Sequence, residues 1–512
     1  MRTIRNNAAL LIVAQGHTIV DTMTLDYASI LKTERLRAGT ALTIAVEAET
    51  DRGRIVFSPA FRRLQQQGQL FSLASSTVVR SRLSHALQVS QVGRAIAARV
   101  AAGLALQGRA DGDTYAALLG FVETACLARD IGSAPYGEAG AAAIRNWFAE
   151  QGPALIRAAS LAYGARDLEA RDPRVLNALV DFHQFNDVPQ GLRMLGKWHW
   201  HGEPGGLNLT KSSLAAYLRH LDMCGGDSIA PDGRSGKESE QRAGFFSTEA
   251  GLVKSIWSTF GYNAAAPQRF PLTLLVEAAH DIVSGFGDLE DAIGIGVIDA
   301  GQALSALRDD WLSTYIPMDP DEADEKIMEL LGQAADAGTP AAFTGVRTEL
   351  FAVMADYAAR SFLGLQDEAF AGRLDTVLLP TSGAGVLLQS LKVFCAARIH
   401  TLEAVQRHAL DGYNIVKDLL QQFSVLLKIS MPRFQAAMDD SHDPSLFLER
   451  QLLALIPSEC RLAYTQAMGH LSGRDQEFEE WNARAHLVVD FIASQADTSA
   501  LAIYRRLAAI DL

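Results

Sequence analysis

The segment over residues 114–129 is apolar around almost its whole circumference, and it constrains the fold more than any other part of the chain. It reads TYAALLGFVETACLAR, a length and composition typical of a helix. A helix that is hydrophobic all round is buried, either in the core of a large protein or in a membrane. No apolar run in the sequence reaches the roughly 18 residues that a membrane span needs. The segment is therefore expected to be the central helix of a large core.

Helical periodicity continues through most of the chain. Residues 84–106 place Leu87, Val92, Ile96 and Val100 on one broad face, which predicts an amphipathic helix. Long alternations of Val and Ile bounded by turns are scarce, so an all-α fold with little or no sheet is expected. Further helices are predicted at about 140–150, 174–184, 211–222, 270–294, 300–312, 320–335, 345–363, 385–428 and 476–494.

Composition excludes several classes of protein. Hydrophobic residues make up 48% of the 512 residues and charged residues 21%, which excludes intrinsic disorder. A net charge of −13 argues against a broadly basic nucleic-acid binder, although a local basic patch stays open. The four cysteines form no CxxC pair, so free thiols and a cytoplasmic location are expected.

The organisation along the chain is expected to follow three parts. Residues 1–45 are interpreted as an N-terminal arm, 46–300 as the domain that carries the site, and 301–512 as a helical region packed in the same fold. Residues 223–244 are rich in Gly, Ser and charge, which predicts a long surface loop. Gly285 and Gly287 lie within a helical pattern, so they do not form a dinucleotide-binding loop.

Three segments bring together residues that carry chemistry. The first contains DRGRIVFSPAFRRLQQ and RSRLSHALQVSQVGR, in which His85 follows Arg82 by three positions. The second is Cys126-Leu-Ala-Arg-Asp-Ile-Gly132, at the end of the predicted central helix. The third is Glu277-Ala-Ala-His-Asp281, followed by GDLEDA.

Together with GLNLTKSSLAAYLRH, RFPLTLLVEAAHDI, LDGYNIV and AIYRRLAAI, these segments resemble the deoxyguanosine triphosphate triphosphohydrolases, a branch of the HD phosphohydrolase superfamily. The matching segments follow the family order over about residues 33–510, nearly the whole chain. The resemblance implies an all-α fold and a hexamer or other homo-oligomer. It also implies hydrolysis of dGTP to deoxyguanosine and tripolyphosphate with a divalent ion such as Mn²⁺ or Mg²⁺.

The resemblance also implies where a metal would bind, and there this sequence departs from the family. The family ligands are a histidine in R-x-R-L-x-H, a His-Asp pair, and an aspartate opening a D-x-x-x-Y-x-x-x-D helix. The corresponding residues here are His85, the pair Arg129-Asp130, and His280. Arginine stays protonated and has no lone pair to donate, so Arg129 cannot be a ligand. The site is therefore predicted to hold no metal.

The positions that serve proton transfer in the family differ as well. Where the family has a histidine and a glutamate after the His-Asp pair, this sequence has Glu138 and Ala141. Glu138 is interpreted as a solvated loop carboxylate, although a replacement general base stays open. In the family motif H-F-E-G-N-A-Q the asparagine is replaced by Val188.

Several nucleotide-contact positions of the family are retained. Gln69 and Asp288 match residues that hold the sugar 3′-hydroxyl, and Arg82 matches a phosphate-contacting arginine. Arg219 lies where a phosphate-binding lysine is usual, and Ser284 replaces a tyrosine that packs on the sugar. These positions predict a pocket for a deoxynucleoside triphosphate, although Gln69 and Asp288 also suit internal hydrogen bonds.

Some residues admit plainer readings. Arg129 is expected to take the place of the missing metal and to pair with Asp130. Alternatively, Asp130 is only a salt-bridge partner or a helix cap. Arg62 and Arg63 suit either a structural contact or a ligand contact. His199 and His201, among tryptophans in a predicted loop, are interpreted as surface packing rather than metal ligands.

Three functions follow from these expectations. The leading one is a non-hydrolysing, nucleotide-binding or regulatory subunit, as a homo-oligomer or with an active relative. The second is an active phosphohydrolase that uses His85, Asp130 and His280 as ligands of an altered site. The third is a scaffold with an empty pocket. Single-stranded DNA is not favoured as a partner because of the net charge of −13, and no membrane is expected.

Overall fold

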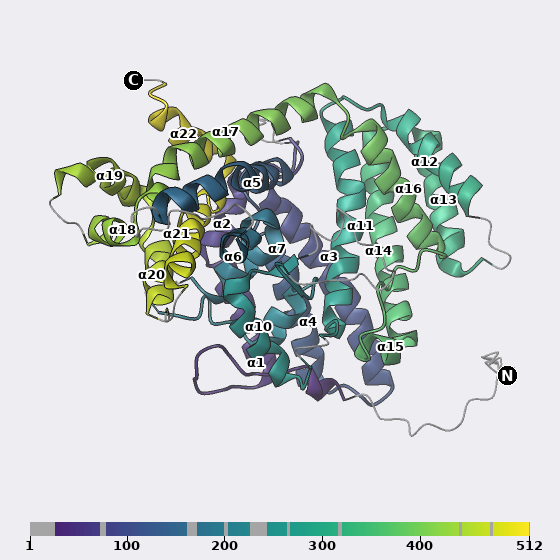
Figure 1. Cartoon of the computed structure of the whole chain (residues 1–512). Coiled ribbons are helices and arrows are strands. Elements are labelled where there is room, and N and C mark those ends of the chain that lie inside the picture. Colours follow the sequence, from purple (N-terminus) through teal and green to yellow (C-terminus); the bar gives the residue numbers. More distant parts are fainter. Residues whose placement is uncertain are drawn as a thin grey trace, which may run out of the picture.

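The computed structural model describes ten stretches of the chain and has an all-α architecture (Figure 1). The described residues are 26–71, 78–160, 172–198, 203–225, 243–263, 267–315, 320–439, 443–469, 471 and 475–510. His199 and His201 lie outside these ranges, as does most of the predicted arm over 1–45. The division into parts at residues 45 and 300 stays a prediction.

The α-helices are α1 (Ile44–Val56), α2 (Pro59–Arg62), α3 (Arg82–Leu106), α4 (Gly112–Ala128), α5 (Glu138–Ser160), α6 (Pro173–His183), α7 (Asp187–Gly196), α8 (Lys211–Tyr217), α10 (Ala250–Thr259), α11 (Pro271–Gly294), α12 (Ala300–Thr314), α13 (Glu322–Ala337), α14 (Pro340–Gly364), α15 (Gln366–Phe370), α16 (Gly383–Arg398), α17 (Glu403–Lys428), α18 (Met431–Met438), α19 (Phe447–Leu455), α20 (Ser458–Met468), α21 (Gln476–Ala493) and α22 (Asp497–Leu507). The shorter 3₁₀ turns are η1 (Tyr27–Ser29), η2 (Arg63–Gln66), η5 (Ser247–Glu249) and η6 (Pro444–Leu446).

Helix α4 is the central helix, as its apolar sequence predicts. It packs against α1, α3, α8 and α11, and nearly all of its residues from Ala117 to Ala128 are buried. A side chain at Gly93 of α3 would meet the sulfur of Cys126 at 2.5 Å, so glycine allows these two helices to approach closely. The C-terminal end of α4 is thereby held deep in the molecule.

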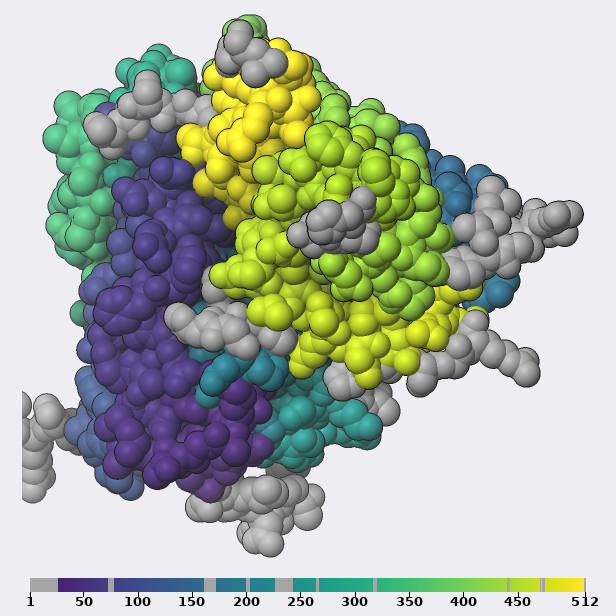
Figure 2. All heavy atoms as spheres, turned by 90° about the vertical axis from the view of Figure 1, so that its left-hand side faces the viewer, coloured from purple at the N-terminus to yellow at the C-terminus, as the bar shows by residue number. Residues whose placement is uncertain are grey.

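Two groups of helices flank this centre. Helices α11 to α14 and α16 stand side by side on the right of Figure 1, while α5, α6 and α18 to α21 lie on the left. Helix α17 runs along the top and packs on α5, α21 and α22. Figure 2 shows the C-terminal helices, in yellow, lying against the N-terminal helices, in purple. The backbone N–H of Gly68 donates to Asp497 Oδ2 at 2.9 Å across this contact.

Some element predictions need correction. The helix predicted over 385–428 is two helices, because Leu402 is extended and starts α17 in a new direction after the buried Ile399. Leu87 is 51% exposed, whereas Val92, Ile96 and Val100 are buried. Leu87 precedes Val92 by five positions, and this offset turns the Leu87 side chain about 140° away from that face.

The ends of the predicted loop over 223–244 form the one small sheet of the described residues. Strands β1 (Asp222–Met223) and β2 (Ala243–Phe245) pair in parallel, and residues 226–242 between them lie outside the described ranges. Among the described helices, none is long and apolar enough to cross a membrane.

Candidate functional site

The candidate site lies where three helices meet at the centre of the fold. Arg82 and His85 come from the first turn of α3, which begins where Ser81 Oγ accepts from the N–H of Ser84. Arg129 and Asp130 directly follow α4, whose end is buried. His280 comes from the middle of α11. The structure thus brings together all four residues at which the resemblance places a metal.

Arg129 contacts His280 rather than Asp130. Its Nη2 atom lies 3.4 Å from Nδ1 of His280, and its Nη1 atom lies 3.6 Å from Oδ2 of Asp187. The ion partner of Asp130 is Arg82, with 3.8 Å between Nη1 and Oδ2. The expected pair of Arg129 with Asp130 is therefore wrong. Successive residues at a helix end point about 100° apart, which sends the two side chains to different neighbours.

The two histidines face each other inside this cluster. The ring centroids of His85 and His280 are 5.6 Å apart, and the rings are perpendicular. His85 is 1% exposed, and neither of its ring nitrogens has a hydrogen-bond partner. Burial lowers the pKa of His85 to about 3, so its imidazole is neutral.

His280 lies between three side chains. Burial, followed by the nearby charge of Arg129, lowers the pKa of His280, so this ring is neutral as well. Nδ1 of His280 lies 3.4 Å from Nη2 of Arg129 and 3.7 Å from Oδ1 of Asp281, so a cation and an anion are both beside this atom. Nε2 lies 3.2 Å from Oγ of Ser284. Both ring nitrogens of His280 therefore contact protein side chains.

Asp130 is a buried carboxylate held ionised by its neighbours. Burial alone would raise its pKa, but the charge of Arg82 and, to a lesser extent, of the other cationic groups lowers the pKa below its usual value. Its Oδ2 atom has no hydrogen-bond partner. Arg82 also donates from Nη1 to Oγ of Ser133 at 3.2 Å, which fixes its guanidinium over the turn that follows α4.

Asp187 is a site residue that the sequence analysis missed. It is the first residue of α7, and its Oδ1 and Oδ2 atoms accept from Nη2 of Arg219 at 2.8 and 3.0 Å. The same carboxylate lies 3.6 Å from Arg129. Loss of solvent contact raises the pKa of Asp187, and the Arg129 charge only partly opposes this. Asp187 therefore links Arg219, which the sequence places at the site, to Arg129.

Gln69 and Asp288 are joined by a second missed residue, Arg80. The N–H of Gln69 donates to the backbone oxygen of Arg80 at 3.2 Å, and Nη2 of Arg80 lies 3.7 Å from Oδ1 of Asp288. Arg80 also donates from Nε to Asp291 at 3.1 Å. The other oxygen of Asp288 lies 3.0 Å from Nε2 of His400. Arg80 therefore contacts Gln69 through its backbone oxygen and Asp288 through its guanidinium, and Oε1 of Gln69 has no partner.

The two positions linked to proton transfer lie apart from these contacts. Glu138 opens α5, pairs with Arg145, and has a side chain that is 70% exposed. It is therefore a helix residue and not the loop residue expected. Ala141 is buried inside α5 and has no group that could move a proton.

Arg63 has a structural role. Its guanidinium donates to the backbone oxygens of Ile131 and Ser133 in the turn after α4, and to those of Ala493 and Gln495 at the end of α21. Burial lowers the pKa of Arg63 to about 9. The arginine thus fixes the turn that carries Asp130 to the C-terminal helices. Arg62 is exposed.

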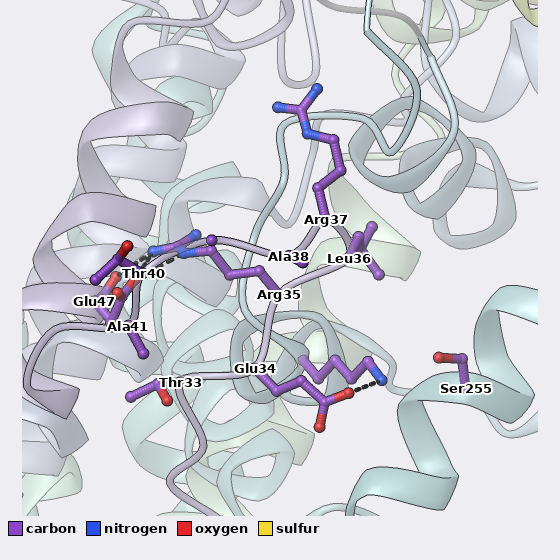
Figure 3. Close-up of a pocket in the computed structure, with 12 residues that line it drawn as sticks. Thr33, Glu34, Arg35, Leu36, Arg37, Ala38, Thr40, Ala41, Glu47 and Ser255 are labelled. Atoms are coloured by element: carbon purple, nitrogen blue, oxygen red, sulfur yellow. Dashed lines mark hydrogen bonds and ion pairs between the residues drawn. The ribbon is translucent and has the colours of Figure 1, made fainter.

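A separate hollow of about 430 Å³ lies beside residues 33–41 (Figure 3). Arg35 points at Glu47 there and also contacts Asp51 at 2.6 Å. Lys211 contacts Glu34 at 2.5 Å. These charges are paired with each other, and none of the residues predicted for the site lines this hollow.

The composition of the cluster favours binding of an anion. Three guanidinium groups, those of Arg82, Arg129 and Arg219, face two carboxylates, those of Asp130 and Asp187. Guanidinium groups bind phosphate oxygens well and repel a divalent cation. In the described part of the chain, no group of three or more His, Cys, Asp and Glu side chains is placed to hold a metal ion.

Comparison with known proteins agrees with the resemblance in the sequence. The chain is 30% identical to the deoxyguanosinetriphosphate triphosphohydrolase of Serratia proteamaculans, over 91% of this chain and 95% of that enzyme. It is 30% identical to the enzyme of the same name from Yersinia enterocolitica, over 90% of this chain and 94% of the relative. The enzyme of the same name from Cronobacter sakazakii is 29% identical, over 90% of this chain and 94% of the relative. No protein-family model matches the chain. Identity at this level over nearly the full length of both proteins shows that the chain belongs to the deoxyguanosinetriphosphate triphosphohydrolase family.

Proposed function

We propose that this protein is a nucleotide-binding member of its family that does not hydrolyse nucleotides. It acts as a regulatory subunit in the cytoplasm, either with copies of itself or with an active relative. Its ligand is a deoxynucleoside triphosphate bound at the junction of α3, α4 and α11. Its retained fold serves binding, and its chemistry is lost.

The contact between Arg129 and His280 carries this proposal. In the family pattern, a histidine and an aspartate that bind metal stand at these two positions. Here Nδ1 of His280 lies 3.4 Å from Nη2 of Arg129 and 3.7 Å from Oδ1 of Asp281, so protein side chains of opposite charge surround this nitrogen. The permanent positive charge of Arg129 at this place also repels a divalent cation. The residues present do not fit Mn²⁺ or Mg²⁺, and no catalytic step is assigned to a metal.

The remaining positions support the loss of hydrolysis. Water attack on phosphorus needs a group that accepts a proton close to the reacting atoms. Ala141 has none, and the exposed Glu138 is engaged by Arg145. His85 is neutral, but it is an imidazole without a hydrogen-bonded orienting partner. The chain therefore departs from the family pattern both at the metal-ligand positions 129 and 280 and at the proton-transfer pair.

Binding is supported by the cations and by the sugar positions. Arg82 and Arg219 lie at the edge of the Arg129 cluster and suit a phosphate chain. Gln69 contacts the backbone of Arg80 and Asp288 contacts its guanidinium, and both side chains carry groups that suit a sugar hydroxyl. Both groups are connected through α3, which begins two residues after Arg80.

Nucleotide-dependent thermal stabilisation tests this proposal. The full-length protein in chelator is heated with each of the four dNTPs, with GTP, and with deoxyguanosine. A ligand at 100 times its dissociation constant adds about 2.7 kcal/mol of stability, which raises the melting temperature measurably. We expect a rise with at least one dNTP that is lost in the Asp288→Asn variant. If no nucleotide raises the melting temperature, the proposal of nucleotide binding is wrong and the protein acts as a scaffold.

An active enzyme with an altered site is the second candidate, and one observation favours it. Both ring nitrogens of His85 and the Oδ2 atom of Asp130 are buried without hydrogen-bond partners. Such orphaned groups suit a ligand, and they are two of the three ligands that this candidate requires. Metal-dependent release of deoxynucleoside would establish it.

A further inference from the structure

We infer that Asp187 is an internal anion that occupies a polyphosphate site formed by Arg129 and Arg219, and that its side chain leaves when a phosphate chain binds. The ligand is a triphosphate or tripolyphosphate free of divalent metal. The inference rests on the proposed function, because it assumes that these arginines receive the phosphates of a nucleotide. It adds that the bound triphosphate carries no divalent metal and that Asp187 competes with it for the arginines.

The geometry shows a carboxylate bound as a ligand anion would be. Both oxygens of Asp187 lie within 3.0 Å of one nitrogen of Arg219, and Oδ2 lies 3.6 Å from Nη1 of Arg129. A phosphate oxygen binds guanidinium groups through the same donors and carries more charge than a carboxylate. Each arginine can therefore exchange one anionic partner for a stronger one.

Exposure shows which group can move. The side chain of Asp187 is 29% exposed, whereas those of Arg129 and Arg219 are 9% and 17% exposed. The carboxylate thus has more contact with solvent than either arginine, and rotation of its side chain would return it to water. Asp130 is only 6% exposed and stays with Arg82 as the fixed counter-ion.

The backbone around Asp187 is fixed, so the exchange needs only a side-chain rotation. A Cβ atom at Gly132 would lie 1.9 Å from the backbone oxygen of Asp187, which shows how closely the turn after α4 packs on the start of α7. The hydroxyl of Tyr217 donates to the backbone oxygen of Val188 at 3.0 Å. These contacts hold the two arginines at a constant distance from α7.

The arginines have donors to spare for a larger anion. The Nε atoms of Arg82, Arg129 and Arg219 are all buried without a hydrogen-bond partner. A guanidinium carries five N–H donors, so each of these arginines keeps a donor for a further oxygen. With Asp187 turned away, Arg129 and Arg219 lose the carboxylate that they share, so the cluster gains one unit of positive charge for a polyanion.

Calorimetric titration of the full-length protein in EDTA tests the inference. The probes are sodium tripolyphosphate, dGTP and deoxyguanosine, and the variants are Asp187→Asn and Asp187→Ala. Removal of a competing charge-assisted hydrogen bond is worth about 1.5–3 kcal/mol, which corresponds to roughly 10- to 100-fold in affinity. We expect both variants to bind tripolyphosphate at least tenfold more tightly than the parent protein.

A matched control is Asp356→Asn. Asp356 on α14 also contacts two arginines, Arg99 at 3.5 Å and Arg360 at 2.9 Å, but none of the residues of the cluster. Its removal should leave the affinity for tripolyphosphate unchanged. The Arg129→Gln variant should bind tripolyphosphate at least tenfold more weakly than the parent. Circular dichroism of each variant confirms that it is folded.

The outcomes separate this inference from the proposed function. If dGTP binds in EDTA but both Asp187 variants bind tripolyphosphate equally or more weakly, Asp187 positions Arg219 and the inference is wrong while the proposed function stands. If the Asp187 variants gain affinity for tripolyphosphate but no nucleotide binds, the anion site exists and the proposed function is wrong. If tripolyphosphate binds neither the parent protein nor the Asp187 variants, the inference is also wrong.

Discussion

Nη2 of Arg129 lies 3.4 Å from Nδ1 of His280, and this contact joins the end of α4 to the middle of α11. It places a permanent cation beside a ring nitrogen of His280. It also leaves Asp130, the neighbour of Arg129 in sequence, to pair with Arg82. The same family fold therefore presents a cluster of arginines where its pattern calls for metal ligands, and this difference underlies the first prediction.

The Arg129→His variant alone should not bind Mn²⁺, whereas Arg129→His combined with His280→Asp should. The single change removes the repelling guanidinium but leaves position 280 without an anionic oxygen, and hard divalent ions prefer carboxylates. The double variant supplies two histidines and two aspartates. Titration calorimetry with MnCl₂ measures both, and adding Asp130→Asn to the double variant should abolish binding. Tight binding by the single variant would contradict the account.

The His85→Leu variant should change the free energy of unfolding at pH 7 by less than about 1 kcal/mol. Both nitrogens of His85 are buried without partners, so an apolar side chain removes an unsatisfied group. His486→Leu is the matched contrast, because it removes the buried contact of Nε2 with Asp181 at 3.0 Å and leaves Asp181 with Ser247 alone. Loss of one partner of a buried hydrogen bond costs about 1–3 kcal/mol. Urea denaturation distinguishes the two, and equal losses would show that His85 has an essential partner.

The pH dependence of stability should also change in His85→Leu. A pKa of about 3 in the folded protein, against the ordinary 6.5, means that the unfolded chain binds a proton more readily. The parent protein therefore loses stability as pH falls below 6.5, by about 2 kcal/mol at pH 5 from this group alone. The variant should lack that loss when both are unfolded in EDTA. If the free energy of unfolding depends on pH in the same way in parent and variant, His85 takes up a proton as readily in the folded protein as in the unfolded chain.

Two glycine variants test the position of Arg82. Gly137 and Gly108 have φ angles of +59° and +68°, so alanine at either position costs about 1–2 kcal/mol of backbone strain. Only at Gly137 would the added carbon meet a side chain, Nη2 of Arg82 at 2.5 Å. Gly137→Ala should therefore weaken the binding of tripolyphosphate in EDTA, while Gly108→Ala should only lower stability. Equal binding by both variants would place Arg82 outside the anion site.

His400 should titrate above its ordinary pKa. A hydrogen bond to Asp288 raises the pKa of His400, because the carboxylate stabilises the charged ring. Asp288→Asn should return the pKa to the ordinary range, and a dNTP that engages Asp288 should shift it as well. NMR of the protein labelled at its histidines follows this titration. An unchanged pKa in Asp288→Asn would show that the contact does not persist in solution.

The sequence predicted the helical core and several site residues because those features are local. An apolar helix over 114–129 and the acidic start of α13, where Asp321 and Asp324 cap the helix, can be read from spacing alone. The pairing of Arg129 could not be read in this way. It depends on the direction in which the chain turns after α4, and the close contact of Gly132 with α7 sets that direction.

Arg80 opens the R-x-R-L-x-H segment and Asp187 directly precedes Val188, but their contacts, like those of His400, cannot be predicted from the local sequence. Each reaches the site through contacts with segments far away in the chain, Asp187 with Arg129 and Arg219, and His400 with Asp288. Glycine at position 287 gave an indirect signal. A Cβ atom there would lie 1.8 Å from Nη1 of Arg80, but only the structure shows which side chain needs the space.

A single-turnover assay tests the central claim most directly. The full-length protein, in excess over dGTP or another dNTP, is incubated with Mn²⁺, with Mg²⁺ or with EDTA, and the products are separated by chromatography. The account predicts that neither deoxynucleoside nor tripolyphosphate is released under any of these conditions. Stoichiometric, metal-dependent release of both products would contradict it, and would make His85, Asp130 and His280 the ligands of a working metal site.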